Sequence, residues 1–275
     1  GDGCEEAVSQ LGALSEDAEW AVHFLLVGGL DAIARQLEKL ALLAEPSAEQ
    51  ATLMHAMVSR LRVLVNEEQL GMIAAIGNAA DIADLRRACG VDEPFVRPQE
   101  STDPGSPTLS ALALCLSTAR GTDMRVHLDV VPLLVAAAED SASSHAALLI
   151  AFDRAAKVRG NGQARFAALV QCCRAPADGG ELEAASRALA LLNALISSPA
   201  RLSARMALRD ECAKLGVLKH VDALKAVVSA AGEEGGSGPT SHLQAHLKLF
   251  ASELAGDERD LLIERQPLEE FAGEC

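Results

Sequence analysis

The sequence predicts an all-α fold, and three observations support this expectation. The apolar fraction is 49% and consists largely of Ala and Leu, whereas aromatic residues make up 3% and Tyr is absent. Such a composition favours helices over β-sheets, which rely on β-branched and aromatic residues. Apolar residues recur at a spacing of three or four positions along nearly the whole chain. Glycines followed by apolar residues punctuate these segments, as they do where one helix ends and another begins.

A recurring step organises the chain: a helix ends, a Gly supplies a left-handed cap, and an apolar residue opens the next helix. The step occurs at Gly28-Gly29-Leu30, at Gly71-Met72-Ile73 and at Gly216-Val217-Leu218. The first two steps lie 43 positions apart, which is the period of an armadillo or HEAT unit of two or three helices. We therefore expect an armadillo-repeat right-handed superhelix, an α-solenoid of about five helical units. The units are expected near residues 15–44, 48–92, 108–139, 140–175 and 181–231.

Three stretches interrupt the helical pattern. Residues 93–107 hold four prolines and are expected to form a long exposed loop, and residues 175–180 separate two helices more tightly. The Gly- and Ser-rich residues 232–239 are expected to be a flexible connector, after which Thr240 or Ser241 N-caps a helix that runs to about Leu254. This pattern divides the chain into a repeat domain over residues 1–231, the connector over 232–239 and a terminal helical segment over 240–275.

The charge balance narrows the possible partners. With 39 acidic and 24 basic residues the formal net charge is −15, so nucleic acid and anionic lipid are repelled whereas a basic peptide is attracted. A net negative charge that only keeps the protein soluble is an equally common explanation of this composition. Neither an N-terminal signal pattern nor a run of 18 apolar residues is present, so we expect a cytosolic, soluble protein without membrane insertion.

Cysteines and histidines offer no metal-binding pattern. The seven Cys are odd in number, form no C-x-x-C pair and lie partly in apolar runs, which favours small core residues over disulfides or zinc ligands. Cys172 and Cys173 are adjacent, so they point to different sides of a helix. Among the seven His, only His242 and His246 share a helix face, and no H-E-x-x-H pattern connects them. A solvated helix face is the favoured interpretation, and no metal or cofactor is expected.

The search for catalytic motifs also fails. The segment Gly160-Asn161-Gly162 lacks the third glycine and the preceding strand of a phosphate-binding loop, so we interpret it as a turn. The sequence contains neither a G-x-S-x-G nor a Walker pattern. We therefore expect no catalytic residues and a protein that is not an enzyme.

One helix is the best candidate for a partner-binding groove. In the helix from Glu183 to Ser197, three apolar residues and one amide lie on one stripe: Leu189, Leu192, Asn193 and Ile196. In stacks of three-helix units the third helices line a concave face that binds peptides and partner helices. The stripe alone does not distinguish such a groove from a contact buried between units.

The last third of the chain carries a family resemblance. Residues 191–199 and 204–217 read LLNALISSP and ARMALRDECAKLGV. They resemble the N-terminal regulatory region of diaphanous-type formins, in which an Asn-Ala-Leu-Ile type helix end precedes a helix of the pattern R-x-x-L-R-x-E-x-x-x-x-G-[LV]. The matching residues are Arg205, Leu208, Arg209, Glu211, Gly216 and Val217.

Other landmarks of the family follow in the expected order, so the resemblance spans about residues 15–255. Trp20 and Phe24 look like the aromatic helix before the first Gly-Leu step, and residues 61–66 look like the end of the second repeat. Residues 151–169 resemble the fourth unit, and residues 243–250 resemble the helix that closes the domain. Residues 94–107 and 120–140 have no counterpart.

The resemblance implies the GTPase-binding and inhibitory module of an actin-nucleating formin. Its partners would be a Rho-family small GTPase near the N-terminal repeats and a C-terminal autoregulatory helix of the same polypeptide on the concave face. Such a module regulates actin filament assembly, meets actin only through other domains, and is cytoplasmic and cytoskeleton-associated. By match of position, Leu189, Leu192, Asn193 and Ile196 would line the groove, and Asn66 would lie on the GTPase side. The alternatives are an armadillo or HEAT adaptor unrelated to actin and, least favoured, an all-helical enzyme.

Overall fold

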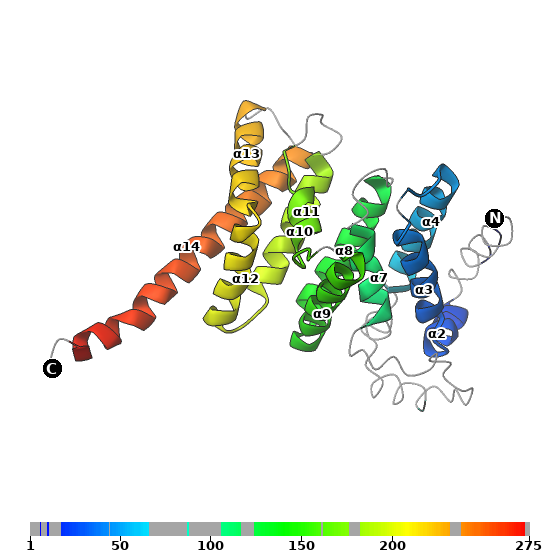
Figure 1. Ribbon diagram of the computed structural model, residues 1–275, viewed down its shortest axis with the longest axis horizontal. Coiled ribbons are helices and arrows are strands. Elements are labelled where there is room, and N and C mark those ends of the chain that lie inside the picture. Colours follow the sequence, from blue (N-terminus) through cyan, green and yellow to red (C-terminus); the bar gives the residue numbers. More distant parts are fainter. Residues whose placement is uncertain are drawn as a thin grey trace. The chain divides into compact units, whose positions relative to one another are not determined.

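The computed structural model describes residues 6, 10, 18–43, 45–65, 87, 106–116, 124–160, 162–175, 182–231 and 238–272. All regular secondary structure within these ranges is α-helical, which confirms the predicted all-α class (Figure 1). The chain divides into two compact units, residues 1–168 and residues 169–275. The superhelical stacking and the division at residues 231–240 remain predictions. The Gly71 step lies outside the described residues.

The first unit is built around a helix that is buried on all sides. Its helices are α2 (Ala18–Leu26), α3 (Gly29–Ala41), α4 (Ala48–Val65), α7 (Pro107–Leu116), α8 (Met124–Asp140) and α9 (Ala142–Arg159). In α7 every residue from Thr108 to Leu116 is buried, as expected of a helix without a polar face. Helices α3 and α9 flank α7, and α8 packs against α9, α7 and α4. The short helix α10 (Ala167–Cys172) spans the boundary between the units.

The predicted glycine steps are confirmed at both sites that the structure describes. Gly28 has φ 90° and ψ 25° before α3, and Gly216 has φ 89° and ψ 17° before the next such helix. L-residues with a side chain rarely adopt this left-handed conformation, so glycine fits these positions. Gly29 is constrained differently, because a Cβ atom there would overlap the ring of Phe24. That ring is itself stacked on Trp20, with 4.8 Å between centroids.

Arginine and aspartate side chains join distant parts of the first unit. Nη2 of Arg159 donates to the carbonyl of Ala41 at 2.9 Å and to that of Leu114 at 3.4 Å. These carbonyls lie near the C-terminal ends of α3 and α7, where intrahelical donors run out and the helix dipole favours a cation. On α8, Asp129 accepts from Arg62 at 2.7 Å and lies 3.2 Å from Nε2 of His55. The α3–α7–α9 and α4–α8 contacts are therefore fixed by polar links as well as by apolar packing.

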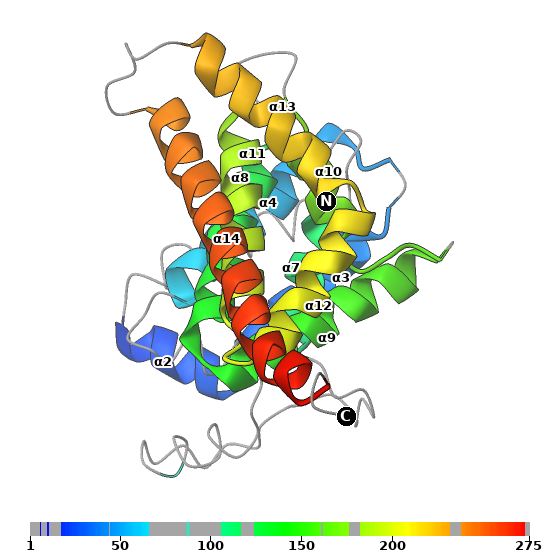
Figure 2. The ribbon, with the colours of Figure 1, turned by 90° about the vertical axis from the view of Figure 1, so that its left-hand side faces the viewer.

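The second unit consists of α11 (Leu182–Ser197), α12 (Leu202–Lys214), α13 (Val217–Ala230) and α14 (Pro239–Ala272). Helix α14 lies alongside α11 and also contacts α12 and α13 (Figure 2). The predicted bounds of the terminal helix are wrong at both ends. It begins at Pro239, with the carbonyl of Gly238 accepting from the amides of Ser241 and His242, because Pro suits the first position of a helix. It continues past Leu254 to Ala272 without a break at Gly256.

The four cysteines among the described residues lie in or near the core, as their apolar sequence context predicts. Cys115, Cys173 and Cys212 are buried, Cys172 is half-buried, and none of these four forms a disulfide. Burial raises the pKa of the Cys115 thiol to about 12 and that of Cys172 to about 11. Thiols with such pKa values are protonated near neutral pH and therefore poor nucleophiles.

Candidate partner-binding surface

Helix α11, which carries the predicted groove, is buried around most of its circumference. Twelve of its residues between Leu182 and Ile196 are buried. Within the predicted stripe, Leu189 and Leu192 are 0% exposed, Ile196 is 2% exposed and Asn193 is 4% exposed. Of the two possibilities left open by the sequence, an open groove and a buried contact, the structure shows these four residues buried.

Helix α14 covers part of α11 with an apolar face of its own. Leu243, Leu247 and Phe250 recur at helical spacing and are all buried. The side chain of Asn193 adds a polar link, because its Nδ2 donates to the backbone carbonyl of His246 at 3.0 Å. An amide in an apolar interior is costly unless it is hydrogen-bonded, and this bond satisfies it.

The four residues predicted for the groove therefore do not form an open surface in this structure. The structure brings Leu189, Leu192, Asn193 and Ile196 together on one helix, as expected, but in its interior. A partner that touches them would have to displace a packed element. Their role in partner binding remains a prediction.

A buried cluster of charges joins α12 to α14. On α12, Arg205 and Arg209 are separated by one helical turn, and each directs its Nε toward Asp257 of α14, at 2.8 Å and 2.6 Å respectively. Asp257 is only 3% exposed and Arg209 8%. The guanidinium of Arg205 also donates to the carbonyls of Pro199 and Ala200, in the loop that leads from α11 into α12. One carboxylate thus holds two arginines, and one of these holds the preceding loop.

The electrostatics of the cluster favour a charged Asp257. Burial alone would raise the pKa of this carboxyl, but hydrogen bonds from Arg209 and Arg205, together with their positive charges, outweigh burial and hold its pKa below the ordinary value. Arg209 also lies over the ring of Phe250, 6.0 Å from its centroid. Its Nη2 is buried and has no hydrogen-bond acceptor among the described residues. Removal of Asp257 would therefore leave buried positive charge without compensation.

Most of the residues that carry the family resemblance have identifiable structural roles in or near this cluster. Arg205 and Arg209 bind Asp257, Leu208 and Val217 are buried, and Gly216 adopts the left-handed turn. Sequence reasoning missed Asp257, which lies about fifty positions further along the chain. The signal that could have pointed to it is the pair of arginines at i and i+4 on one face of α12, which requires an acidic partner when it is buried.

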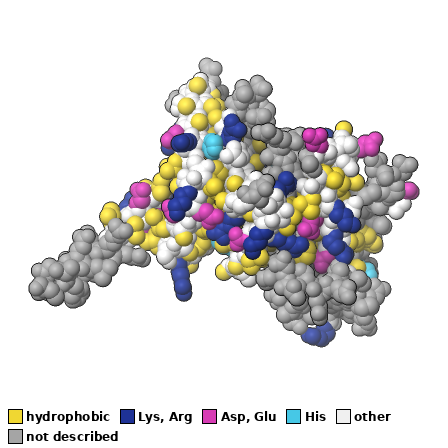
Figure 3. Space-filling view, viewed as in Figure 1, with side chains coloured by type: hydrophobic (Ala, Val, Ile, Leu, Met, Phe, Trp, Pro, Cys, Tyr) yellow, Lys and Arg dark blue, Asp and Glu magenta, His cyan; other side chains and the backbone are white. Residues whose placement is uncertain are grey.

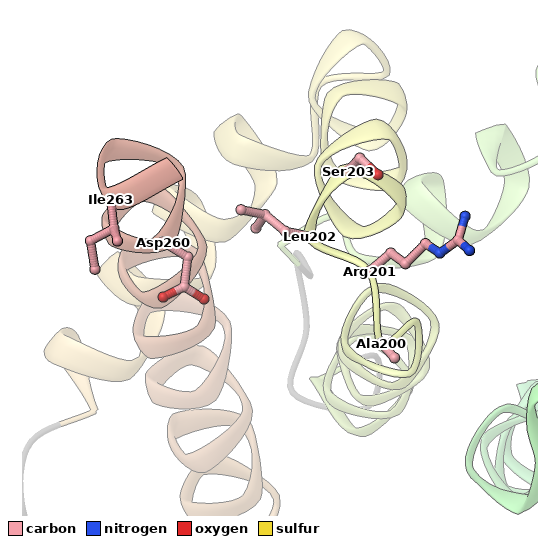
Figure 4. Close-up of a pocket in the computed structure, with 6 residues that line it drawn as sticks. All are labelled: Ala200, Arg201, Leu202, Ser203, Asp260 and Ile263. Atoms are coloured by element: carbon pink, nitrogen blue, oxygen red, sulfur yellow. The ribbon is translucent and has the colours of Figure 1, made fainter. Parts of the chain in front are cut away.

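An open cleft of about 580 Å³ lies next to this cluster, between the start of α12 and the later part of α14. Its lining comes from residues 200–203 on one side and from Asp260 and Ile263 on the other. Figure 4 shows the side chain of Leu202 directed toward α14, whereas that of Arg201 points away from it. Ile263 is 59% exposed. The cleft is an open concave surface of the second unit, and its lining combines polar and apolar side chains.

One predicted site residue, Asn66, lies outside the second unit, and the expectations on metal sites and membrane-spanning helices concern all the described residues. Asn66, expected on the GTPase side, lies outside the described residues, which end at Val65 in this region. Among the described side chains, no group of three His, Cys, Asp or Glu residues could hold a metal ion. No helix in the described ranges is long and apolar enough to cross a membrane.

Comparison with known families gives a match over the second half of the chain. Residues 145–271 match the family model of the Diaphanous FH3 domain, a non-catalytic regulatory domain of formins. The match begins in α9 and ends in α14, so it includes α11, the arginines of α12, the Gly216 step and Asp257. The resemblance predicted from the sequence is confirmed over these residues and remains a prediction before residue 145. A search of curated proteins finds no match.

Proposed function

We propose, on the premise that residues 145–271 are a Diaphanous FH3 domain, that this chain is the regulatory protein-binding module of an actin-nucleating formin. It binds a Rho-family small GTPase and a C-terminal autoregulatory helix of the same polypeptide, and so regulates actin filament assembly. In this proposal the helical units stack as an armadillo-type superhelix of about five units. The module acts in the cytoplasm at the cytoskeleton and reaches actin through other domains. The observation that carries the proposal is the family match over residues 145–271.

The proposed regulation is a coupling between two binding events. If the GTPase and the autoregulatory helix bind different states of the module, each lowers the affinity for the other by the same factor. A GTPase that binds equally well in its GDP and GTP forms could not act as a switch. The net charge of −15 supports a basic autoregulatory segment, because opposite charge accelerates encounter and stabilises the complex.

The site residues of the proposal keep the roles that the resemblance implies. Leu189, Leu192, Asn193 and Ile196 are the proposed contacts of the autoregulatory helix, and Asn66 is the proposed contact of the GTPase. Burial sets a condition on the first group, since the helix reaches them only by displacing an element packed on α11. If these four residues only support the binding surface from the interior, their substitution lowers the free energy of unfolding. The affinity of the folded protein for the autoregulatory helix is then unchanged.

A titration with nucleotide-loaded GTPases tests the proposal. The purified chain is titrated with a Rho-family GTPase that carries either GDP or a non-hydrolysable GTP analogue. We expect the GTP form to bind at least about tenfold more tightly than the GDP form, which corresponds to a difference of about 1.4 kcal/mol in the free energy of binding. Asn66→Ala should weaken this complex and leave binding of the autoregulatory helix intact. Equal affinity for the two nucleotide forms would contradict the regulatory role, and binding of neither form would favour an adaptor unrelated to actin.

A further inference from the structure

A stripe on α3 combines positive charge with exposed apolar surface. Arg35, Glu38, Lys39 and Leu42 recur at a spacing of three or four positions, so they share one face of the helix and of the residue that caps it. Arg35 and Lys39 are exposed. Leu42 is 46% exposed, although large aliphatic side chains favour the interior.

A matching stripe lies on the last turns of α9. Arg154, Lys157 and Val158 recur at i, i+3 and i+4 and therefore share a face. Lys157 is exposed, and Val158 is exposed at 43%. Both stripes thus end in an exposed aliphatic side chain next to a lysine.

Two contacts place the stripes side by side. Nη2 of Arg154 lies 3.3 Å from Oε1 of Glu38, and Nη2 of Arg159 donates to the carbonyl of Ala41 at 2.9 Å. The pairings 154 with 38 and 159 with 41 run in the same direction, so the C-terminal ends of α3 and α9 lie together. Helix α7 is buried beneath them and packs against both.

We define the α3–α9 surface by six residues: Arg35, Lys39, Leu42, Lys157, Val158 and Arg159. Two carboxylates lie near these residues, and both are paired: Glu38 with Arg154, and Asp153, one turn before Lys157, with Arg165 at 3.6 Å. Neither Lys39 nor Lys157 forms an ion pair with any described residue. Figure 3 shows Lys and Arg side chains over α9 and α3, with hydrophobic and some acidic side chains among them. A chain with a net charge of −15 thus presents a local excess of positive charge.

We propose that the α3–α9 surface binds an acidic amphipathic helix of a partner protein. Carboxylates of that helix pair with Lys39 and Lys157, while its apolar side chains cover Leu42 and Val158. The proposal goes beyond the regulatory function above and does not depend on it.

Two features favour an acidic peptide over the other anionic partners. Nucleic acid offers phosphates but leaves Leu42 and Val158 without apolar contacts, and its charge density is repelled by the acidic remainder of the chain. An anionic membrane presents an extended surface, which the acidic remainder of the chain also opposes. A short helix engages the local excess of positive charge without approaching the rest of the molecule.

A designed probe peptide tests the proposal on the full chain. The probe is a fluorescent peptide of about four helical turns with Leu on one face and Glu elsewhere, and its matched control is uncharged, with Gln in place of every Glu. We expect the acidic probe to bind at least tenfold more tightly than the control, and its binding to weaken as ionic strength rises from about 50 to about 300 mM. The double variant Lys39→Glu/Lys157→Glu should lose at least tenfold in affinity for the acidic probe.

A matched variant separates this site from an effect of net charge. Lys219→Glu/Lys248→Glu carries the same charge change on exposed lysines of the second unit, and we expect less than a threefold loss. Thermal unfolding checks that each variant is folded, and Lys39→Gln/Lys157→Gln replaces the first variant if it is not.

The proposal is overturned by equal binding of the two peptides, by no binding of the acidic one, or by equal losses in the two double variants. It is also overturned if phosphatidylserine vesicles or duplex DNA bind through Lys39 and Lys157 and the acidic probe does not.

Discussion

Replacement of Asp257 by Ala tests the structural basis of the contact between α12 and α14. The substitution removes the carboxylate that accepts from Nε of Arg205 at 2.8 Å and from Nε of Arg209 at 2.6 Å. Both arginines remain charged, and Arg209 is only 8% exposed. Its Nη2 already lacks an acceptor among the described residues, so the guanidinium would lose its acidic partner in a site that water hardly reaches.

The expected loss of stability follows from this burial. Removal of one member of a buried ion pair typically costs about 3–5 kcal/mol, because the remaining charge is left uncompensated. For a unit of roughly one hundred residues that corresponds to a fall in Tm of more than about 10 °C. An exposed pair gives the matched control: Lys225 and Asp222 lie 3.3 Å apart with both side chains largely exposed, so Asp222→Ala should change stability by less than about 1 kcal/mol.

Urea unfolding followed by circular dichroism gives both free energies of unfolding. A third variant, Arg209→Met/Asp257→Leu, replaces the more buried pair by apolar groups and should recover much of the loss, because the penalty arises from unpaired charge rather than from the missing attraction. Arg205 stays charged in this variant but keeps the carbonyls of Pro199 and Ala200 and the carboxylate of Asp260, 3.7 Å from its Nη2. An Asp257→Ala variant that is as stable as Asp222→Ala would refute the reasoning. So would a double variant that is less stable than Asp257→Ala itself.

Three further predictions concern the core of α11, two glycines in helices α3 and α14, and the titration of Asp257. Leu192→Asp should lower Tm by more than about 10 °C, because Leu192 is 0% exposed and a carboxylate in a fully buried position is costly. A stable variant that has lost partner binding would instead identify an accessible groove. Gly29→Ala should lower the free energy of unfolding by about 1–3 kcal/mol in thermal melts, since its Cβ would overlap the stacked Phe24 ring. Gly256→Ala has open space around its Cβ and should raise the free energy of unfolding by up to about 1 kcal/mol. Equal effects of the two substitutions would contradict this reasoning. The lowered pKa of Asp257 means that its contribution to stability is present above the ordinary Asp pKa of about 3.9 and is lost as pH falls through the lower folded-state value. Asp257→Asn should therefore be less stable than wild type at pH 6, and the difference should shrink in melts toward pH 3; a constant difference would refute this assignment.

Local signals in the sequence predicted the helices and their junctions. Gly28 and Gly216 adopt the expected left-handed conformation because the requirement lies in the residue itself and its immediate neighbours. The helical spacing of apolar residues likewise predicted helices within the expected units 15–44 and 48–92, where the structure has α3 and α4. The end of α14 was missed because Gly256 lowers helix propensity by about 1 kcal/mol, and the packing and ion pairs around Asp257 override so small a preference.

Long-range relations could not be predicted in this way. The apolar stripe of Leu189, Leu192 and Ile196 fits a groove and a core equally well, and only the position of α14 decides between them. The partner of Arg205 and Arg209 lies on another helix about fifty positions away, and the sequence offers many acidic residues as candidates. The α3–α9 surface was missed for the same reason, since its two stripes lie more than one hundred positions apart.

The proposal that this chain is an inhibitory module of a formin is tested by inhibition in trans. The purified chain is added to the actin-assembling C-terminal region of the formin polypeptide to which we propose it belongs, and filament assembly is followed by pyrene-actin fluorescence. We predict that the chain slows assembly in a saturable manner, and that a GTP-loaded Rho-family GTPase restores the rate whereas the GDP-loaded form does not. Assembly that is unaffected by the chain at concentrations of about 10 μM, where a complex with a Kd near 1 μM would be about nine-tenths formed, would contradict the claim.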